Sequence, residues 1–177
     1  MSESGRAKTV VLVGLMGAGK TTVGRLLAAR LSFPFADSDH EVEHRTGVSV
    51  ATVFEIEGED GFRRRESTVI RDLLNTPSMI LATGGGAVLR QENREAIRQA
   101  DMVAYIAVDP KMLYERTRHD RNRPLLQVSD PLAKLTELHA LRDPLYREVS
   151  TIVIDGNRNN AKQIVDLLEK ELLKCDR

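Results

Sequence analysis

The sequence of 177 residues contains no tryptophan, a single cysteine and only 4% aromatic residues. Because Cys175 has no second cysteine to pair with, an internal disulfide is excluded, and its place near the C-terminus is typical of a tail thiol rather than a nucleophile. No apolar run approaches the ~20 residues of a membrane span. The N-terminal stretch MSESGRAKT also lacks the apolar core of a secretion signal, so we expect a cytoplasmic protein without a membrane partner.

An excess of one charge is absent as well, since 26 lysines and arginines balance 26 aspartates and glutamates. Without a global positive field, neither nucleic acid nor an anionic membrane is favoured as a partner, and any affinity for anions must come from local clusters. Apolar residues make up 41% of the chain and no segment has low complexity, which argues against disorder. The length fits a single domain, residues 1–177, and the lack of an apolar seam favours a monomer.

Five short apolar runs alternate with helical patterns along the chain. This alternation predicts an α/β protein with a mostly parallel sheet covered by helices on both faces. Leucines at positions 132, 135, 138 and 141 are expected on one face of a helix in which Pro144 introduces a kink or a restart. The expected strands are 9–14, 33–37, 78–83, 101–108 and 151–155, and the expected helices are 20–32, 39–44, two within 47–74 broken near Gly58–Gly61, 90–99, 109–118, 131–149 and 160–174.

The stretch GLMGAGKT, from Gly14 to Thr21, matches the phosphate-binding pattern G-x-x-x-x-G-K-[ST] between an expected strand and an expected helix. Glycines at 14, 17 and 19 would let the loop fold back so that backbone N–H groups point inward, and the next helix adds its positive N-terminal end. Lys20 is then expected to reach the β- and γ-phosphates, and the Thr21 hydroxyl to bind Mg²⁺. The pattern therefore predicts a nucleotide site.

A carboxylate for Mg²⁺ is missing from the third expected strand, which ends in Thr83 and glycines, and the guanine-reading pattern N-K-x-D is absent. The stretch FADSD offers Asp37 and Asp39 instead. In extended chain their i, i+2 spacing points both side chains the same way, so one could orient metal-bound water while the other faces a different partner. Alternatively, one of them caps the following helix, for which Asp39 is the stronger candidate.

Three arginines have neighbours that suggest a positioned cation. Arg63 and Glu66, in GFRRRE, are spaced i, i+3 and can pair across a helical turn, although a solvated charge run is the alternative for Arg63. Arg123 and Arg142 stand beside prolines in NRPLL and LRDPLY. An arginine next to constrained backbone often serves as a fork for a carboxylate or a phosphate.

Three consecutive glycines, 84–86, follow an apolar run in LATGGGAVL. A strand needs no such ending and a simple turn rarely needs three glycines. The run predicts that something approaches the backbone so closely that a Cβ would collide with it.

Taken in order, the stretches GLMGAGKTTVGRLLA, FADSD, GFRRRE, TGGGAV, RPLL and RDPLYREV resemble the motifs of shikimate kinases, from the phosphate loop to the last helix. The resemblance implies a three-layer α/β/α P-loop kinase fold with five parallel strands in the order 2-3-1-4-5, a shikimate-binding region at about 37–63 and a mobile lid at about 119–129. It also implies transfer of the ATP γ-phosphoryl group to the 3-hydroxyl of shikimate, in aromatic amino acid (chorismate) biosynthesis, with one Mg²⁺ ion as cofactor.

The resemblance further implies roles for individual residues. The two arginines of the acceptor site would clamp the shikimate carboxylate, while an aspartate would accept from the ring hydroxyls. In the segment expected to face adenine, Asn159–Ala161 depart from the family's commoner pattern. The implied residues are Lys20, Asp39 and Arg123 for catalysis; Gly17, Ala18, Gly19, Lys20, Thr21, Thr22, Arg116, Arg123 and Asn159 for ATP; Asp39, Phe62, Arg63, Glu66, Gly84, Gly85, Gly86 and Arg142 for shikimate; and Thr21 directly, with Asp37 through water, for Mg²⁺.

Two other functions remain compatible with a phosphate loop. A kinase for another small polyol acid, such as gluconate, would keep Lys20 and Thr21 but need not keep Asp39 together with both pocket arginines. A nucleotide-binding regulatory module without catalysis would be expected to lose Lys20, Asp39 or a pocket arginine, and the sequence has them all.

Overall fold

The computed structural model describes residues 8–174. The prediction for the Cys175 thiol lies outside the described residues, as does most of the N-terminal stretch MSESGRAKT. Among residues 8–174, no helix is long and apolar enough to cross a membrane.

A five-stranded sheet forms the centre of the molecule, and every pair of neighbouring strands is parallel. The strand order β2-β3-β1-β4-β5 confirms the order implied by the resemblance. In β1 every residue is buried, because helices cover both faces and leave no room for an alternating pattern. The strands are β1 Val10–Val13, β2 Phe35–Asp37, β3 Ile80–Ala82, β4 Met102–Ala107 and β5 Ile152–Asp155.

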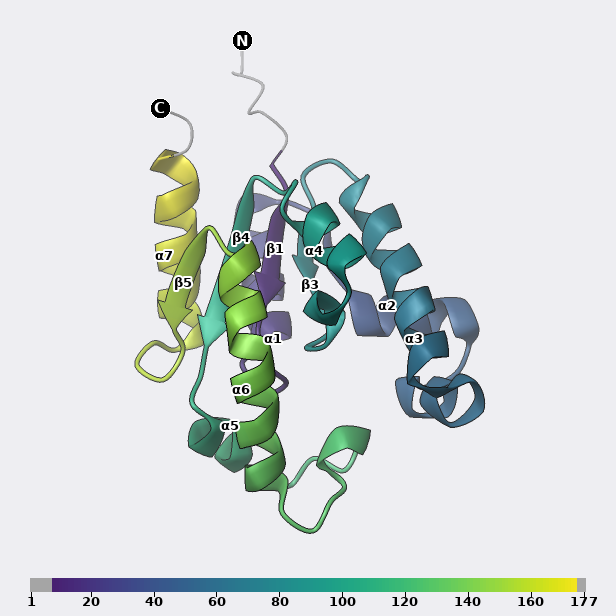
Figure 1. Ribbon diagram of the computed structural model, residues 1–177. Helices are drawn as coiled ribbons and strands as arrows, with labels where there is room; N and C mark the ends of the chain where they lie inside the picture. The colour runs from purple at the N-terminus through teal and green to yellow at the C-terminus, as the bar shows by residue number, and fades with distance from the viewer. Residues whose placement is uncertain (1–7, 175–177) are drawn as a thin grey trace.

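Seven α-helices and two short 3-10 turns surround the sheet in the described residues. Figure 1 shows α1 behind the sheet and α4 and α6 in front of it, and α1 packs against α7. This is the expected three-layer arrangement. The helices are α1 Lys20–Leu31, α2 Ser38–Thr46, α3 Val50–Leu74, α4 Gln91–Ile97, α5 Pro110–Thr117, α6 Pro131–Val149 and α7 Ala161–Lys174, and the turns are η1 Ala87–Leu89 and η2 Pro124–Leu126.

Two helical details bear on the predictions. The break expected near Gly58 is present, because Gly58 has φ 70° and ψ −179° inside α3. By contrast, α6 runs through Pro144 without restarting, and Leu141 is 59% exposed rather than on the face shared by the other leucines. A three-residue step leaves the helix about 60° short of a full turn, so a series of such steps drifts away from the core.

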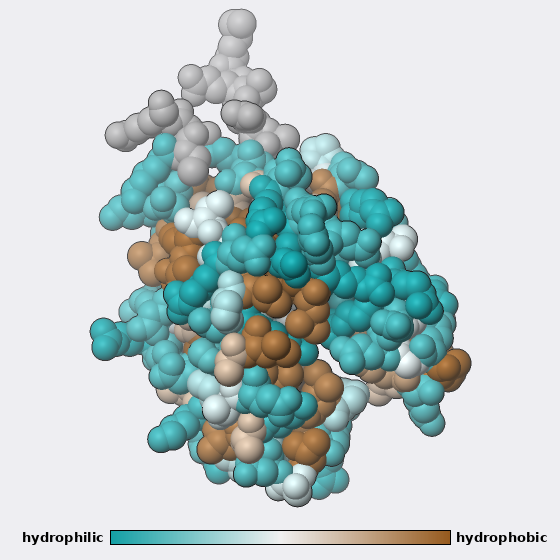
Figure 2. Space-filling view, viewed as in Figure 1, coloured by the Kyte–Doolittle hydropathy of each residue, from teal (hydrophilic) through white to brown (hydrophobic). Residues whose placement is uncertain are grey.

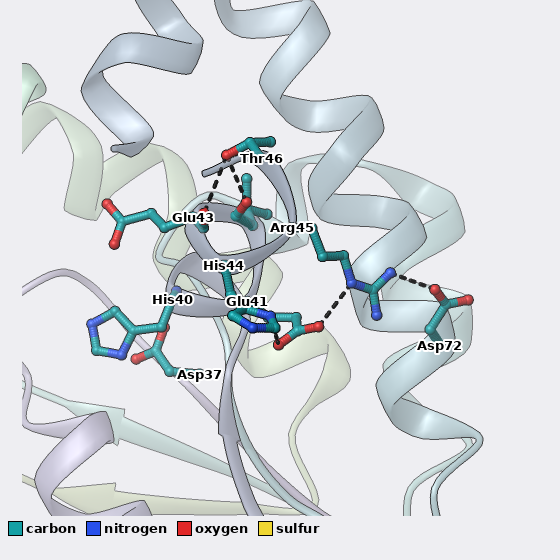
Figure 3. A network of polar contacts seen from close by, with 9 residues as sticks. Asp37, His40, Glu41, Glu43, His44, Arg45, Thr46 and Asp72 are labelled. Atoms are coloured by element: carbon teal, nitrogen blue, oxygen red, sulfur yellow. Dashed lines mark hydrogen bonds and ion pairs between the residues drawn. The ribbon is translucent and has the colours of Figure 1, made fainter. Parts of the chain in front are cut away.

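The core gathers around β1 and β4, and a smaller apolar cluster (Val42, Val53, Phe62 and Val69) joins α2 to α3. On the face seen in Figure 2, mostly hydrophilic residues cover the region of α2 and α3, and hydrophobic residues gather near the centre of the view. Arg45 forms ion pairs with Glu41 of the same helix, α2, at 2.8 Å and with Asp72 of α3 at 2.6 Å (Figure 3). Surface ion pairs of this kind contribute at most about 1 kcal/mol each, so the apolar cluster is the main support.

Candidate functional site

The loop between β1 and α1 has the backbone geometry expected of a phosphate cradle. Gly14, Gly17 and Gly19 have φ values of 148°, 82° and 95°, which side-chain-bearing residues rarely adopt. Space is also limited: a Cβ on Gly14 would lie 2.8 Å from the carbonyl oxygen of Ile106, and one on Gly17 would lie 2.6 Å from Cγ2 of Thr117. Both the conformation and the packing therefore require glycine at positions 14 and 17.

Lys20 is the first residue of α1 and is buried, with its ammonium group folded into the loop. Its Nζ donates to the carbonyl oxygens of Gly14 and Leu15 at 2.6 and 2.9 Å. Burial lowers the pKa of Lys20 from 10.5 to about 8, and the negative charges of Asp39 and Asp37 oppose that shift. A phosphate group in the loop would stabilise the charged form further.

The next residue, Thr21, donates its hydroxyl to Oδ2 of Asp37 at 2.6 Å, while Thr22 is exposed in the first turn of α1. The other oxygen of Asp37 accepts from the N–H groups of Asp39 and His40, so Asp37 is the N-cap of α2. The alternative in which Asp39 caps the helix is therefore wrong. Because β2 ends at Asp37 and the helix begins directly after it, the two aspartates do not share an extended chain, and Asp39 is free of the capping role.

Asp39 faces the triple glycine and a buried carboxylate. A Cβ on Gly84 would lie 2.5 Å from Oδ1 of Asp39 and 2.7 Å from Oε1 of Glu66. Burial raises the pKa of Asp39 from 3.8 to about 7, helped by the charges of Glu66 and Asp37 and opposed by Lys20. A carboxyl group with this pKa can hold or release a proton near neutral pH.

Arg63 and Glu66 form the pair predicted from their spacing, with Nη1 of Arg63 2.6 Å from Oε2 of Glu66. Both side chains are buried, so the solvated alternative for Arg63 was wrong. Burial raises the pKa of Glu66, and Glu59 lies 3.5 Å from the same guanidinium. Phe62 is buried, and its ring centroid lies 5.2 Å from Cζ of Arg63. The same ring packs against Phe54, with 4.6 Å between the ring centroids.

The glycine turn fits between these groups and the phosphate loop. None of its three residues has a positive φ, so packing and not backbone conformation accounts for Gly84 and Gly86. A Cβ on Gly86 would collide with the Arg63 guanidinium, with Cζ at 2.5 Å. A Cβ on Gly85 would lie 3.4 Å from the backbone nitrogen of Met16 in the phosphate loop and 3.6 Å from Nη1 of Arg142.

Arg142, on α6, is 3% exposed and completes the cluster. Three buried polar atoms in it have no hydrogen-bond partner among the described residues, namely Nε of Arg63, Nε of Arg142 and Oε1 of Glu66. Buried polar atoms in native proteins are rarely left unpaired, so this cluster is suited to a small polar ligand. The cavity of about 460 Å³ that Arg63 also lines is bordered by Glu57, Asp60 and other residues of a different set, which does not include Asp39 or Arg142.

Arg116, at the end of α5, connects the phosphate loop with the loop after β5. Its guanidinium donates to the carbonyl oxygens of Gly17 and Gly156 at 3.3 and 3.0 Å and lies 3.5 Å from that of Ala18. Asn159 follows in the same loop and donates to the carbonyl oxygen of the last residue of β5 at 2.8 Å. The two residues implied for adenine therefore stand on neighbouring segments at one end of the phosphate loop.

Residues 119–129 have little regular structure apart from η2, as the sequence predicts. Arg123, within this segment, donates from Nε to Asp120 at 2.8 Å. The positive charges of Arg123 and Arg142 both lower the pKa of Lys20, after burial, so both guanidinium groups are within electrostatic reach of the phosphate loop.

Two residues of the cluster were missed in the sequence. Ser38 accepts from the N–H of Gly84 at 2.8 Å, and Tyr146 donates its hydroxyl to the carbonyl oxygen of Gly85 at 2.5 Å. In the sequence, Ser38 stands out only as the neighbour of Asp39, and Tyr146 only by its position four residues after Arg142. Neither position predicts a contact with the glycine turn.

A phosphate loop after the first strand of a 2-3-1-4-5 parallel sheet, facing a buried cluster of carboxylates and arginines, defines the P-loop kinases of small molecules as the class of this protein. Comparison with known proteins narrows the class. The family model described as shikimate kinase matches residues 16–173, and the chain belongs to the shikimate kinase family, whose members are ATP-dependent kinases.

Individual relatives agree with the family model. The chain is 61% identical to a shikimate kinase of Dechloromonas aromatica over 164 residues, 93% of this chain and 90% of the relative. It resembles the structure of a shikimate kinase from Acinetobacter baumannii in complex with shikimate, with TM-score 0.92, 45% identity and coverage of 95% and 94% of the two chains. A gluconokinase from Sinorhizobium meliloti shares only the fold, at TM-score 0.60 and 20% identity over 97% and 98%.

Proposed function

We propose that this protein transfers the γ-phosphoryl group of ATP to the 3-hydroxyl of shikimate, giving shikimate 3-phosphate and ADP. The observation that carries the proposal is the position of Gly85, where a Cβ would lie 3.4 Å from the backbone nitrogen of Met16 in the phosphate loop and 3.6 Å from Nη1 of Arg142. An acceptor lying on this bare backbone would be next to the γ-phosphate, and two buried guanidinium groups, Arg63 and Arg142, would hold its carboxylate. Such a clamp favours an acid over a neutral sugar.

On the nucleotide side, the phosphates would lie in the loop from Gly17 to Thr22, with Lys20 bound to the β- and γ-phosphates. The hydrogen bonds that Lys20 makes to two loop carbonyls keep its charge inside the loop before ATP arrives. Arg116 and Asn159 would contact adenine from the two segments that meet beside Gly17.

A hydroxyl and a carboxylate, which are the hard oxygen donors that Mg²⁺ prefers, lie side by side at Thr21 and Asp37. Thr21 would bind the ion directly and Asp37 through water. When bound, Mg²⁺ would neutralise charge on the β- and γ-phosphates. The N-cap role of Asp37 holds this carboxylate in place on the second strand.

On the acceptor side, Asp39 would orient the 3-hydroxyl and accept its proton as the phosphoryl group is transferred. A pKa of about 7 supports that role, because the group can take up a proton without a large cost near neutral pH. Glu66 would hold Arg63 in the orientation that the substrate carboxylate needs, and Phe62 would support the guanidinium from below.

The segment 119–129 would act as a lid. Its closure would bring Arg123 from Asp120 onto the transferring phosphoryl group and exclude water, which would otherwise compete as acceptor. The balanced charge of the chain and the lack of an apolar seam in its sequence support a monomer.

The function is tested by measuring ADP formation with Mg²⁺–ATP and, in separate reactions, shikimate, gluconate or no acceptor. We expect shikimate alone to raise the rate above the background hydrolysis of ATP. Faster turnover with gluconate would assign a different acceptor, and ATP binding without turnover on either acid would favour a regulatory module.

Gly85→Ala separates the needs of the acceptor from those of the chain. The added methyl group would have ordinary contact distances to the protein, the nearest being 3.4 Å, so the variant should fold and bind Mg²⁺–ATP within about twofold of the parent. If shikimate lies on this backbone, its affinity should fall about tenfold or more, which corresponds to ~1.4 kcal/mol. Calorimetric titration with each ligand separately measures both; an unchanged affinity for shikimate would remove the glycine turn from the acceptor site.

Asp39→Asn should trade activity for stability. Because the native pKa of Asp39 is raised from 3.8 to about 7, protonation stabilises the native state, and this stabilisation is lost as the pH rises through about 7. In nucleotide- and metal-free buffer, the variant should therefore melt at a higher temperature than the parent at about pH 8, by an amount that shrinks towards about pH 5. Asp60→Asn, at an exposed position of α3, is the control. A lower melting temperature for Asp39→Asn than for the parent at about pH 8 would contradict the raised pKa of Asp39.

A further inference from the structure

The triple-glycine turn is fastened by two side-chain hydroxyls from opposite sides. Oγ of Ser38, at the start of α2, accepts from the N–H of Gly84 at 2.8 Å. Oη of Tyr146, in α6, donates to the carbonyl oxygen of Gly85 at 2.5 Å. Both residues are buried, at 0% and 1% exposure.

These hydroxyls determine where the turn lies because its other backbone bonds run forward along the chain. The carbonyl oxygens of Gly84 and Gly86 accept from Ala87 and Leu89, which fixes the start of η1 but not the place of the turn relative to other elements. The parallel ladder of β3 stops at Ala82, and Thr83 still donates from its N–H and its hydroxyl to the carbonyl oxygen of Leu12 in β1, at 3.1 and 3.0 Å. After Thr83, the side-chain hydrogen bonds to the glycine backbone come from α2 and α6.

Each hydroxyl is attached to the same element as a residue proposed to contact the acceptor. Ser38 immediately precedes Asp39 in the first turn of α2. Tyr146 follows Arg142 by four residues, so both side chains stand on one face of α6. Burial raises the pKa of Tyr146, and the charge of Arg142 beside the hydroxyl opposes this shift, which is consistent with their proximity.

We infer that Ser38 and Tyr146 are positioning residues for the acceptor: they set the distance from the glycine turn to the Asp39 carboxylate and to the Arg142 guanidinium. The inference rests on the proposed function. Neither hydroxyl need touch shikimate, because its effect passes through Gly84 or Gly85. The turn is thereby kept in register with the clamp on one side and with the aspartate on the other.

Tyr146→Phe tests the inference, and Tyr105→Phe is its matched control. The Tyr105 ring, on β4, lies 5.0 Å from that of Tyr146, and its hydroxyl also donates to α6, but to Asp143 at 2.7 Å instead of to the turn. We expect Tyr146→Phe to raise the KM for shikimate about tenfold while the KM for ATP stays within about twofold, since only the acceptor side depends on the turn. Tyr105→Phe should change the KM for shikimate by less than about twofold.

Ser38→Ala is the second variant, and thermal melting of all variants is measured in parallel. Because Ser38 holds the turn against α2, its loss should lower kcat about tenfold, with a smaller effect on the KM for ATP. If the hydroxyls only stabilise the fold, the melting temperatures would drop while the kinetic constants of Tyr146→Phe and Tyr105→Phe remain alike, and the inference is overturned. Failure of the parent protein to phosphorylate shikimate would instead overturn the proposed function.

Discussion

Lys20→Met is expected to lower turnover about a hundredfold or more, because loss of one preorganised charge contact to the transition state costs ~3 kcal/mol. The side chain is buried in the phosphate loop, and among the described residues its ammonium group bonds only to the carbonyl oxygens of Gly14 and Leu15. Methionine keeps the length of the side chain and removes the charge, so the core should be undisturbed. Steady-state kinetics with saturating ATP and shikimate measures the effect.

The control is Lys162→Met, which removes an exposed lysine from α7. It should leave turnover and the melting temperature nearly unchanged. Near-normal turnover in folded Lys20→Met would contradict the kinase mechanism itself. A variant that does not fold would be replaced by Lys20→Arg, in which the charge remains but the bulky fork no longer fits the loop, and a large loss of turnover is again expected.

Arg142→Ala is expected to raise the KM for shikimate about a hundredfold, since a charge-assisted hydrogen bond to a buried group is worth up to ~3 kcal/mol. The KM for ATP should change far less, because Arg142 packs beside Gly85 of the acceptor turn. Arg147→Ala is the matched control: it lies on the same helix, is exposed and pairs with Asp143 at 2.8 Å.

Arg123→Ala should show the reverse pattern, with a loss of turnover and of ATP use and a smaller effect on shikimate. Its side chain belongs to segment 119–129 and is held only by Asp120 within the described contacts. If Arg142→Ala and Arg123→Ala affected both substrates alike, the division into acceptor site and lid would be wrong.

Much of the fold could be predicted from local patterns. Buried parallel strands are continuous apolar runs, so β1 and β4 were recognisable without any tertiary information. The break at Gly58 was visible because glycine punctuates a helical pattern. The outward position of Leu141 was missed, since a three-residue spacing resembles a helical face over one turn and departs from it over several.

The candidate site was predictable to different depths. The phosphate loop is local in sequence, so its glycines and Lys20 could be read directly from one motif. The Arg63–Glu66 pair was predictable because a helix fixes i, i+3 neighbours, but its complete burial was not. Capping was an alternative for either aspartate and favoured Asp39, whereas the cap is Asp37, because the exact start of a helix depends on the strand that precedes it.

Contacts between the glycine turn and helices distant in the sequence could not be predicted. Ser38 and Gly84 are 46 residues apart, and Tyr146 and Gly85 are 61 apart, so no periodicity connects them. The reason for three glycines was also hidden. Side chains of the protein crowd Gly84 and Gly86, whereas a Cβ on Gly85 would meet only ordinary contact distances. None of the three positions requires a left-handed backbone.

Identification of the product tests the central proposal most directly. The protein would be incubated with Mg²⁺–ATP and shikimate, and the mixture examined by two-dimensional ¹H–³¹P correlation spectroscopy. Besides the signals of ADP, the account predicts one new phosphorus signal, coupled to the ring proton on C3 of shikimate and formed in equal amount with ADP. Phosphorus coupled to the proton of a different ring carbon, or inorganic phosphate as the only product, would contradict it.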